Sequence, residues 1–116
     1  MVTVTLWFKV SSEKRKDFLD SARLLIEPTK IQPGCTSCRL YQDLNDPDAV
    51  FLVEEWESRE ELDRYFKSDQ FRIILSLMEF SSDYPEFKIN TISETEGLEA
   101  VQELYFRGRY QIPVDR

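Results

Sequence analysis

The stretch that decides the fold is VTVTLWFKV, residues 2–10. Every second residue in it is aliphatic or aromatic, and these residues are Val2, Val4, Leu6, Phe8 and Val10. Because successive side chains of an extended chain point to opposite faces, this period of two predicts a β-strand with one fully apolar face. The first element is therefore a strand that buries one side.

A helix follows the first strand. Ser11 and Ser12 offer side-chain oxygens for its N-cap, and Pro28 is expected to limit or kink it near its end. Its apolar stripe, at helical spacing, consists of Phe18, Leu19, Ala22, Leu25 and Ile26. The sequence thus predicts a strand followed by an amphipathic helix.

The middle of the chain predicts a β-hairpin. A turn signal at residues 32–34 precedes a strand over residues 35–43, and a second turn at residues 45–48 leads into a strand over residues 50–56. The short connection between the two strands makes them antiparallel.

The second helical region is expected in two pieces. Ser58 and Glu61 form a capping box for the first piece, and Ser68 can cap the second. Pro85 ends this region, and residues 87–91 alternate as a fourth strand. The resulting order, β-α-β-β-α-β, predicts a ferredoxin-like α+β fold with a four-stranded antiparallel sheet and helices on one face.

The other face of such a sheet must be solvated or covered. The second row of the first strand contains Trp7, and both rows of strand 50–56 carry large apolar residues. Apolar residues on both rows indicate that both faces are buried. We predict that a second copy of the same sheet covers this face, so that the protein is a homodimer.

Residues 1–93 are expected to form this domain, and residues 94–116 a C-terminal helix and tail. After Gly97, an apolar stripe predicts a short amphipathic helix, followed by an extended end with Tyr110 and Ile112. This stripe consists of Leu98, Val101, Leu104 and Tyr105. We predict that the segment packs on its own domain or, preferably, on the partner protomer.

Composition limits the partners. With 22 acidic and 15 basic residues the net charge is −7, so a phosphate backbone or an anionic membrane surface is repelled on average. No apolar stretch approaches the roughly 20 residues that cross a bilayer, and no secretory signal is evident at the N-terminus. We expect a cytoplasmic protein that binds neither nucleic acid nor membranes.

The sequence contains no histidine. A zinc site, a histidine-ligated haem and a Ser-His-Asp triad within one chain are therefore excluded, and we expect neither a metal nor a cofactor. The two cysteines, Cys35 and Cys38, are expected three residues apart on one strand, on opposite faces and roughly 10 Å apart. We interpret them as structural residues of a protein from a reducing compartment.

Several short segments between Val2 and Ile92 together resemble the antibiotic biosynthesis monooxygenase family. They are Glu27-Pro28-Thr29-Lys30, Gln32-Pro33-Gly34-Cys35, Leu40-Tyr41-Gln42-Asp43, Asp46-Pro47, Glu54-Glu55-Trp56-Glu57-Ser58, and Glu61-Leu62 with Tyr65. The resemblance implies a dimeric α+β barrel, in which two four-stranded sheets stack face to face and each protomer keeps a pocket between sheet and helices. It also implies relatives of three kinds: cofactor-free oxygenases of quinols and aromatic polyketides, haem-degrading proteins, and many proteins with no assigned substrate.

The chain departs from the family pattern at Tyr65, where many relatives carry histidine. Haem-degrading relatives use a histidine-ligated iron with a tryptophan and an asparagine nearby, and only Trp56 corresponds to these residues here. Haem degradation is therefore the third of the functions that we weigh.

The resemblance suggests where substrate would bind. Trp56 and Tyr65 are the leading candidates for the pocket wall, with Tyr65 as a hydrogen-bond donor to a substrate oxygen and Trp56 as a stacking surface or N–H donor. The alternative is that both are core residues whose polar ends are satisfied. Adjacent Glu54 and Glu55 must point to opposite faces, so one of them could serve as a general base; a solvated carboxylate or an interface ion pair is the alternative.

Three more residues complete the expected substrate-binding set. They are Arg39, which could stabilise an anionic substrate oxygen, together with Tyr41 and Phe71. For Arg39 the alternative is a surface or interface salt bridge, and for Tyr41 it is a core residue with a satisfied hydroxyl.

Two functions are thus in competition. The first is a homodimeric, cofactor-free monooxygenase of a small aromatic or quinol substrate, with Tyr65 and Glu54 as its catalytic residues. The second is a non-catalytic dimeric module that binds a ligand or serves in stress. A closed aromatic pocket holding a carboxylate or a tyrosine hydroxyl favours the first, and a pocket filled by its own side chains favours the second.

Overall fold

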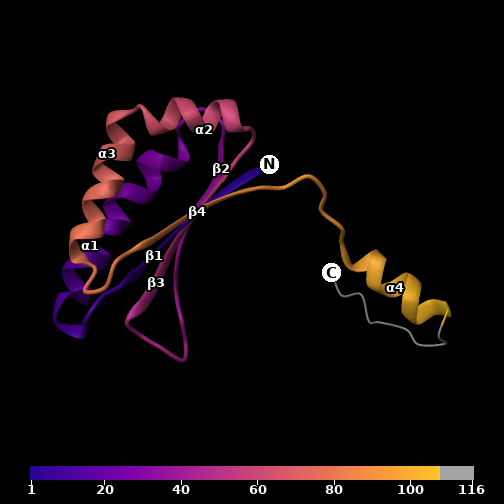
Figure 1. The fold of residues 1–116 in the computed structure, drawn as a ribbon, viewed down its shortest axis with the longest axis horizontal. Coiled ribbons are helices and arrows are strands. Elements are labelled where there is room, and N and C mark those ends of the chain that lie inside the picture. The colour runs from indigo at the N-terminus through magenta and orange to yellow at the C-terminus, as the bar shows by residue number, and fades with distance from the viewer. Residues whose placement is uncertain (108–116) are drawn as a thin grey trace.

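The computed structural model describes residues 1–107, which form an α+β body and one separate helix (Figure 1). The predicted β-α-β-β-α-β order is confirmed, with a 3₁₀ turn, η1, added before the last strand. The elements are β1 (Val2–Lys9), α1 (Ser12–Lys30), β2 (Cys35–Gln42), β3 (Ala49–Trp56), α2 (Arg59–Phe66), α3 (Asp69–Ser76), η1 (Leu77–Phe80), β4 (Glu86–Thr91) and α4 (Leu98–Arg107).

The strands form one antiparallel sheet in the order β2-β3-β1-β4. β1 lies in the interior and pairs on both sides: Val4 is opposite Glu54 of β3 and opposite Ile89 of β4. β2 and β4 are the edges. Helices α1, α2 and α3 gather on one side of the strands (Figure 1).

The core lies between the sheet and these three helices. The predicted row of β1 is buried along its whole length, and Phe8 packs against Phe18 of α1 with ring centroids 5.3 Å apart. Phe18 also packs edge-on against Phe80 of η1. Burying a large apolar side chain of this kind stabilises a fold by about 2–3 kcal/mol, so this row fixes the sheet against α1.

The helix boundaries follow the predicted caps. The Ser58 hydroxyl accepts a hydrogen bond from the Glu61 amide, and the Ser68 hydroxyl accepts one from the Phe71 amide. Pro28 lies in the last turn of α1, which ends two residues later at Lys30. Within residues 1–107, no helix has the length and apolar character needed to span a membrane.

Gly34 makes the turn from α1 into β2 possible. Its φ of +88° lies in the left-handed region that favours glycine. A Cβ at this position would also lie 2.4 Å from the Cβ of Glu61 on α2. Glycine is therefore required here by backbone conformation and by the close approach of α2.

The face of the sheet away from the helices carries apolar side chains. In β3 the outward row holds Phe51 and Val53, and Trp7 of β1 lies opposite Phe51. All three are partly exposed in the single chain. This arrangement is the one expected for a face that a second sheet covers, and the homodimer stays a prediction.

The placement predicted for the two cysteines is wrong. A β-bulge at Thr36 shifts the register of β2, so that Cys35 lies opposite Trp56 and Cys38 opposite Glu54. Because Glu54 and Trp56 share the helix-facing side of β3, both thiols point to that side as well. The extra residue of the bulge cancels the alternation that would have separated them. Both are free cysteines.

Helix α4 stands apart from the body, at the far end of an extended segment that follows β4 (Figure 1). Its exposed apolar side chains include those of Leu98, Val101, Leu104 and Tyr105, with Leu104 at 71%. Its packing on a partner protomer stays a prediction. The extended tail predicted around Tyr110 and Ile112 lies outside the described residues.

Candidate functional site

The feature that stands out in the core is a buried carboxylate, Glu54, which is 0% exposed. Its Oε1 accepts a hydrogen bond from Trp56 Nε1 at 3.1 Å, and its Oε2 accepts one from the Tyr65 hydroxyl at 3.1 Å. A buried acid is rare unless it is paired, and here neither donor is charged. The three residues form what we call the Glu54 cluster.

The sequence builds the cluster from two elements. Glu54 and Trp56 are two residues apart on β3 and therefore share its helix-facing side, whereas Glu55 points to the outer face. Tyr65 comes from α2, and Leu62, one turn earlier, is fully buried and anchors that helix to the sheet. The cap at Ser58 fixes where α2 begins and so which residues it turns inward.

Burial raises the pKa of the Glu54 carboxyl from 4.5 to about 6, although the hydrogen bonds from Trp56 and Tyr65 act in the opposite direction. A carboxyl with such a pKa is ionised near neutral pH and still accepts a proton readily. This is the property that a general base needs.

Tyr65 keeps its proton. Burial, the negative charge of Glu54 and the hydrogen bond to that carboxylate all raise the pKa of its hydroxyl. It is therefore a donor over the physiological pH range. Trp56 is a donor only, so the carboxylate is held by two neutral N–H and O–H groups.

Two polar residues that sequence reasoning missed extend the cluster. Thr29 is fully buried near Tyr65, whose pKa its hydroxyl lowers, and it donates a hydrogen bond to the Leu25 carbonyl at 2.8 Å. Gln70 Nε2 donates to Thr29 Oγ1 at 3.2 Å. The signal available in the sequence was a threonine next to the apolar stripe of a helix.

Aromatic rings connect the cluster to the surface. Trp56 stacks on Tyr65 at 4.4 Å between centroids, Tyr65 meets Phe71 edge-on at 5.3 Å, and Phe71 meets Phe87 of β4 at 6.3 Å. Phe66 packs against Phe71 at 4.7 Å. Phe71, predicted from sequence as a substrate-binding residue, thus lies beside Tyr65.

The outer end of these rings opens into an apolar hollow of about 360 Å³, which we call the aromatic hollow. It is lined by Phe66, Phe71, Leu75, Met78 and Phe87. This hollow is wide open to the surface, and its volume is at the lower end of the roughly 300–1,000 Å³ of small-ligand pockets, which are also mainly apolar.

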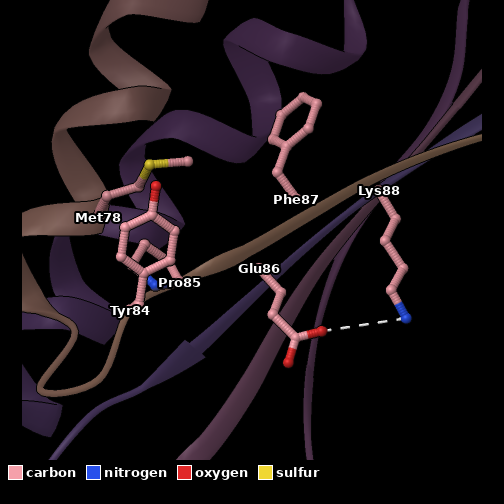
Figure 2. Close-up of a pocket in the computed structure, with 6 residues that line it drawn as sticks. All are labelled: Met78, Tyr84, Pro85, Glu86, Phe87 and Lys88. Carbon is pink, nitrogen blue, oxygen red and sulfur yellow. Dashed lines mark ion pairs between the residues drawn. The ribbon is translucent and has the colours of Figure 1, made fainter.

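A second surface hollow, of about 550 Å³, adjoins it along β4 (Figure 2). Figure 2 shows Phe87 pointing towards the helices, whereas Glu86 and Lys88 point away and form an ion pair at 4.0 Å. Met78 and Phe87 line both hollows. Aromatic side chains therefore gather along this edge of the sheet.

The Glu54 cluster itself is closed in the single chain. Glu54, Trp56 and Tyr65 are at most 2% exposed, and packed side chains fill the space around them. A cavity of about 90 Å³ reaches Tyr65 from the side of Gln32. A small aromatic molecule could reach the carboxylate only after a ring such as Phe71 moved.

The remaining predicted residues are not brought to this cluster. Arg39 and Tyr41 lie opposite Val53 and Phe51, on the outer face of the sheet. The structure therefore unites Glu54, Trp56, Tyr65 and Phe71 in one place and separates them from the other two. Within residues 1–107, no group of three or more Cys, Asp or Glu side chains is placed to hold a metal ion.

Comparisons with known proteins place the chain in a family. The model of the family described as antibiotic biosynthesis monooxygenase matches residues 1–74. An uncharacterized protein of Synechocystis sp. is 32% identical over 94 residues, which are 78% of this chain and 62% of that protein. The chain thus spans 60–62% of the length of the curated relatives it matches.

Solved structures have a similar fold. A conserved protein from Methanosarcina mazei Go1 is 31% identical, with a TM-score of 0.71 over 77% of this chain and 89% of that chain. A protein from Mycobacterium tuberculosis is 21% identical, with a TM-score of 0.72 over 83% and 98%, and shows the fold alone. These similarities show the fold, and membership of the family supports a monooxygenase-like or small-molecule-binding fold.

Proposed function

Because the chain belongs to the antibiotic biosynthesis monooxygenase family, we propose that it is a cofactor-independent monooxygenase of a small quinol or related phenol. The observation that carries the proposal is the buried carboxyl of Glu54, whose pKa is raised to about 6 and which faces two neutral donors. An acid that is buried in this way costs stability, and such groups concentrate at functional sites.

In the proposed reaction, the Glu54 carboxylate removes a proton from a substrate hydroxyl. The resulting electron-rich phenolate supplies the electrons that reduce dioxygen. For a hydroquinone, one oxygen atom is inserted into a ring C–H bond and the other leaves as water, while the ring is oxidised to the quinone, so that hydroquinone and O₂ yield a hydroxyquinone and H₂O. The substrate itself is the reductant.

Tyr65 and Trp56 would stabilise negative charge by donating hydrogen bonds. They donate to Glu54 in the resting chain, and either donor can turn to the anionic oxygen of a bound phenolate once Glu54 is protonated. The surrounding apolar side chains keep water out, which strengthens each hydrogen bond and protects a reactive intermediate.

The substrate would bind first in the aromatic hollow. The ring of Phe71 lines this hollow and packs directly against the ring of Tyr65, so it separates the hollow from Tyr65. A flat aromatic molecule matches its lining, and displacement of Phe71 would bring a substrate hydroxyl to the Glu54 cluster. In this proposal Phe71 is a substrate-binding residue and a gate.

The proposal includes a homodimer in the cytoplasm. The apolar outer face of the sheet, with Trp7, Phe51 and Val53, would be covered by the same face of a second protomer. Arg39 and Tyr41 lie on that outer face, so they would contribute to the interface rather than bind substrate.

Oxygen consumption tests the proposal. Purified protein is mixed with a panel of dihydroxynaphthalene-type quinols, and we expect oxygen uptake that Glu54→Gln lowers by about 10²-fold or more, the scale of general-base catalysis. Glu55→Gln, a neighbouring change with the same charge difference on the other face, is the control. A rate no higher than that of the quinol alone across the panel would contradict the proposal.

One observation favours the second function, a non-catalytic module that binds a ligand. The space around Glu54 is filled by the protein's own side chains, which is the arrangement expected where a polar cluster has a structural role. Saturable binding of a quinol with no oxygen uptake, and with equal affinity in Glu54→Gln, would select this function.

A further inference from the structure

A groove between α1 and the free edge of β2 combines apolar and basic lining residues. It has a volume of about 600 Å³, within the range of small-molecule sites, and it shares no lining residue with the aromatic hollow. Its helix side is formed by Leu19, Arg23, Ile26 and Lys30. These positions are four, three and four residues apart, so they form one stripe that alternates apolar and basic side chains.

The strand side of the groove is apolar at its base. Leu40, half-buried, and Cys38, fully buried, line it from the helix-facing side of β2. Only four residues connect α1 to β2, so β2 runs back alongside α1. The groove between them is therefore elongated. From Leu19 to Lys30 the helix rises by about 16 Å.

The charge of this groove is opposite to that of the protein. The chain has a net charge of −7, yet Arg23 and Lys30 are the charged residues on the helix side of the groove, and no acidic side chain lines it. Within residues 1–107, Arg23 and Arg39 form no ion pair, and Lys30 has an exposed pairing with Glu27 at 3.4 Å. Basic side chains in an acidic protein attract anions locally.

We propose that this groove binds a free, monomeric amphiphile with one carboxylate, such as a medium- or long-chain fatty acid. The apolar chain would lie on Leu19, Ile26 and Leu40, and the carboxylate would be held by Arg23 and Lys30. The aromatic hollow offers apolar side chains but no basic lining residue, and in the hollow along β4 the basic residue Lys88 is paired with Glu86. The site is distinct from the Glu54 cluster and goes beyond the proposed monooxygenase function.

Titration calorimetry with dodecanoate, below its micelle concentration, tests the proposal. We expect saturable binding of one molecule per chain, weakened about tenfold or more in the double variant Arg23→Gln/Lys30→Gln and by replacing dodecanoate with dodecanol. Arg72→Gln, which removes an exposed arginine of α3 that pairs with Asp69, is the matched control and should bind as the wild type does.

Arg23 and Lys30 lie on α1, away from the outer face of the sheet. The double variant should therefore keep the oligomeric state of the wild type in sedimentation. Backbone NMR shifts on dodecanoate addition should map to Leu19–Lys30 and Cys38–Gln42. Equal affinity in the double variant, equal affinity for dodecanol, or shifts centred on Phe71 and Phe87 would overturn the proposal.

A membrane surface carries the same combination of apolar chain and negative charge. Vesicles of phosphatidylglycerol distinguish the two sources: we expect the protein to stay in the supernatant when the vesicles are sedimented. Binding to the vesicles without binding of monomeric dodecanoate would overturn the assignment to a free amphiphile. Oxygen uptake with quinols is measured separately, so its failure would not affect this result.

Discussion

Trp56 donates its indole N–H to the carboxylate of Glu54, two residues earlier on the same strand, at 3.1 Å, and both side chains are fully buried. The pair is local in sequence, yet its energetics come from the core around it. Burial raises the pKa of Glu54, and the hydrogen bond opposes that rise without cancelling it.

The raised pKa makes stability depend on pH. The pKa of Glu54 is 4.5 in an unfolded chain and about 6 in the fold, so its contribution is fully present below pH 4.5 and is lost as pH rises through 6. We expect the free energy of unfolding to fall by about 2 kcal/mol across this window relative to Glu54→Gln. Urea unfolding at several pH values measures the difference, with Glu55→Gln as the control; parallel pH profiles for the wild type and Glu54→Gln would contradict it.

Removing the second donor should perturb Glu54 further. In Tyr65→Phe the carboxylate keeps only its bond from Trp56, so its pKa should rise above 6, and above that pH the protein should lose about 1–3 kcal/mol of stability. Carboxyl ¹³C NMR titration gives the pKa. Tyr84→Phe, at a tyrosine that is 92% exposed, is the control and should change neither quantity.

The outer face of the sheet should determine the oligomeric state. Val53→Lys places a charge in the middle of that face, and we expect it to convert a dimer into a folded monomer, because a buried unpaired charge is costly. Light scattering after size exclusion measures the mass. Leu44→Lys, at a position that is 96% exposed, is the control; a wild-type protein that is monomeric at micromolar concentration would disprove the dimer itself.

The C-terminal segment is expected to strengthen the dimer. A chain truncated after Ser93 loses α4, whose Leu98 and Leu104 are exposed in the single protomer. The α+β body should keep its circular dichroism, whereas the dimer dissociation constant, measured by sedimentation, should rise about tenfold or more. Leu98→Lys/Leu104→Lys in the full chain should reproduce the effect. A truncated dimer of unchanged stability would show that α4 packs elsewhere.

The two thiols should be unreactive at neutral pH. Burial raises the pKa of Cys35 to about 11 and that of Cys38 to about 12, and only the thiolate reacts with alkylating reagents. We expect slow modification by iodoacetamide in the folded protein, Cys35 before Cys38, and rapid modification of both in denaturant. Mass spectrometry of timed samples measures this, and fast labelling of Cys38 in the native protein would contradict it.

Much of the fold could be predicted from local patterns. The alternation in residues 2–10 and the serines at positions 58 and 68 correctly indicate a strand and two helix starts, because side-chain alternation and capping are properties of neighbouring residues. For the same reason, the sequence correctly predicts that Glu54 and Glu55 point to opposite faces of the sheet.

Which of these two acids is buried was decided only by the tertiary structure, since both rows of β3 are apolar enough to face the helices. The bulge at Thr36 could not be predicted from the sequence either, because it depends on how β2 pairs with β3 rather than on local composition. The bulge places Cys35 on the same face of the sheet as Cys38.

By itself, the sequence determined the order of the elements and the alternation of side chains along each strand. The tertiary structure decided that Tyr65, eleven residues beyond Glu54, donates to that carboxylate, and that basic residues of α1 line a groove along the edge of β2. The reason is physical: backbone geometry fixes the direction of a side chain relative to its neighbours in sequence, whereas burial and pairing between distant elements fix which groups meet.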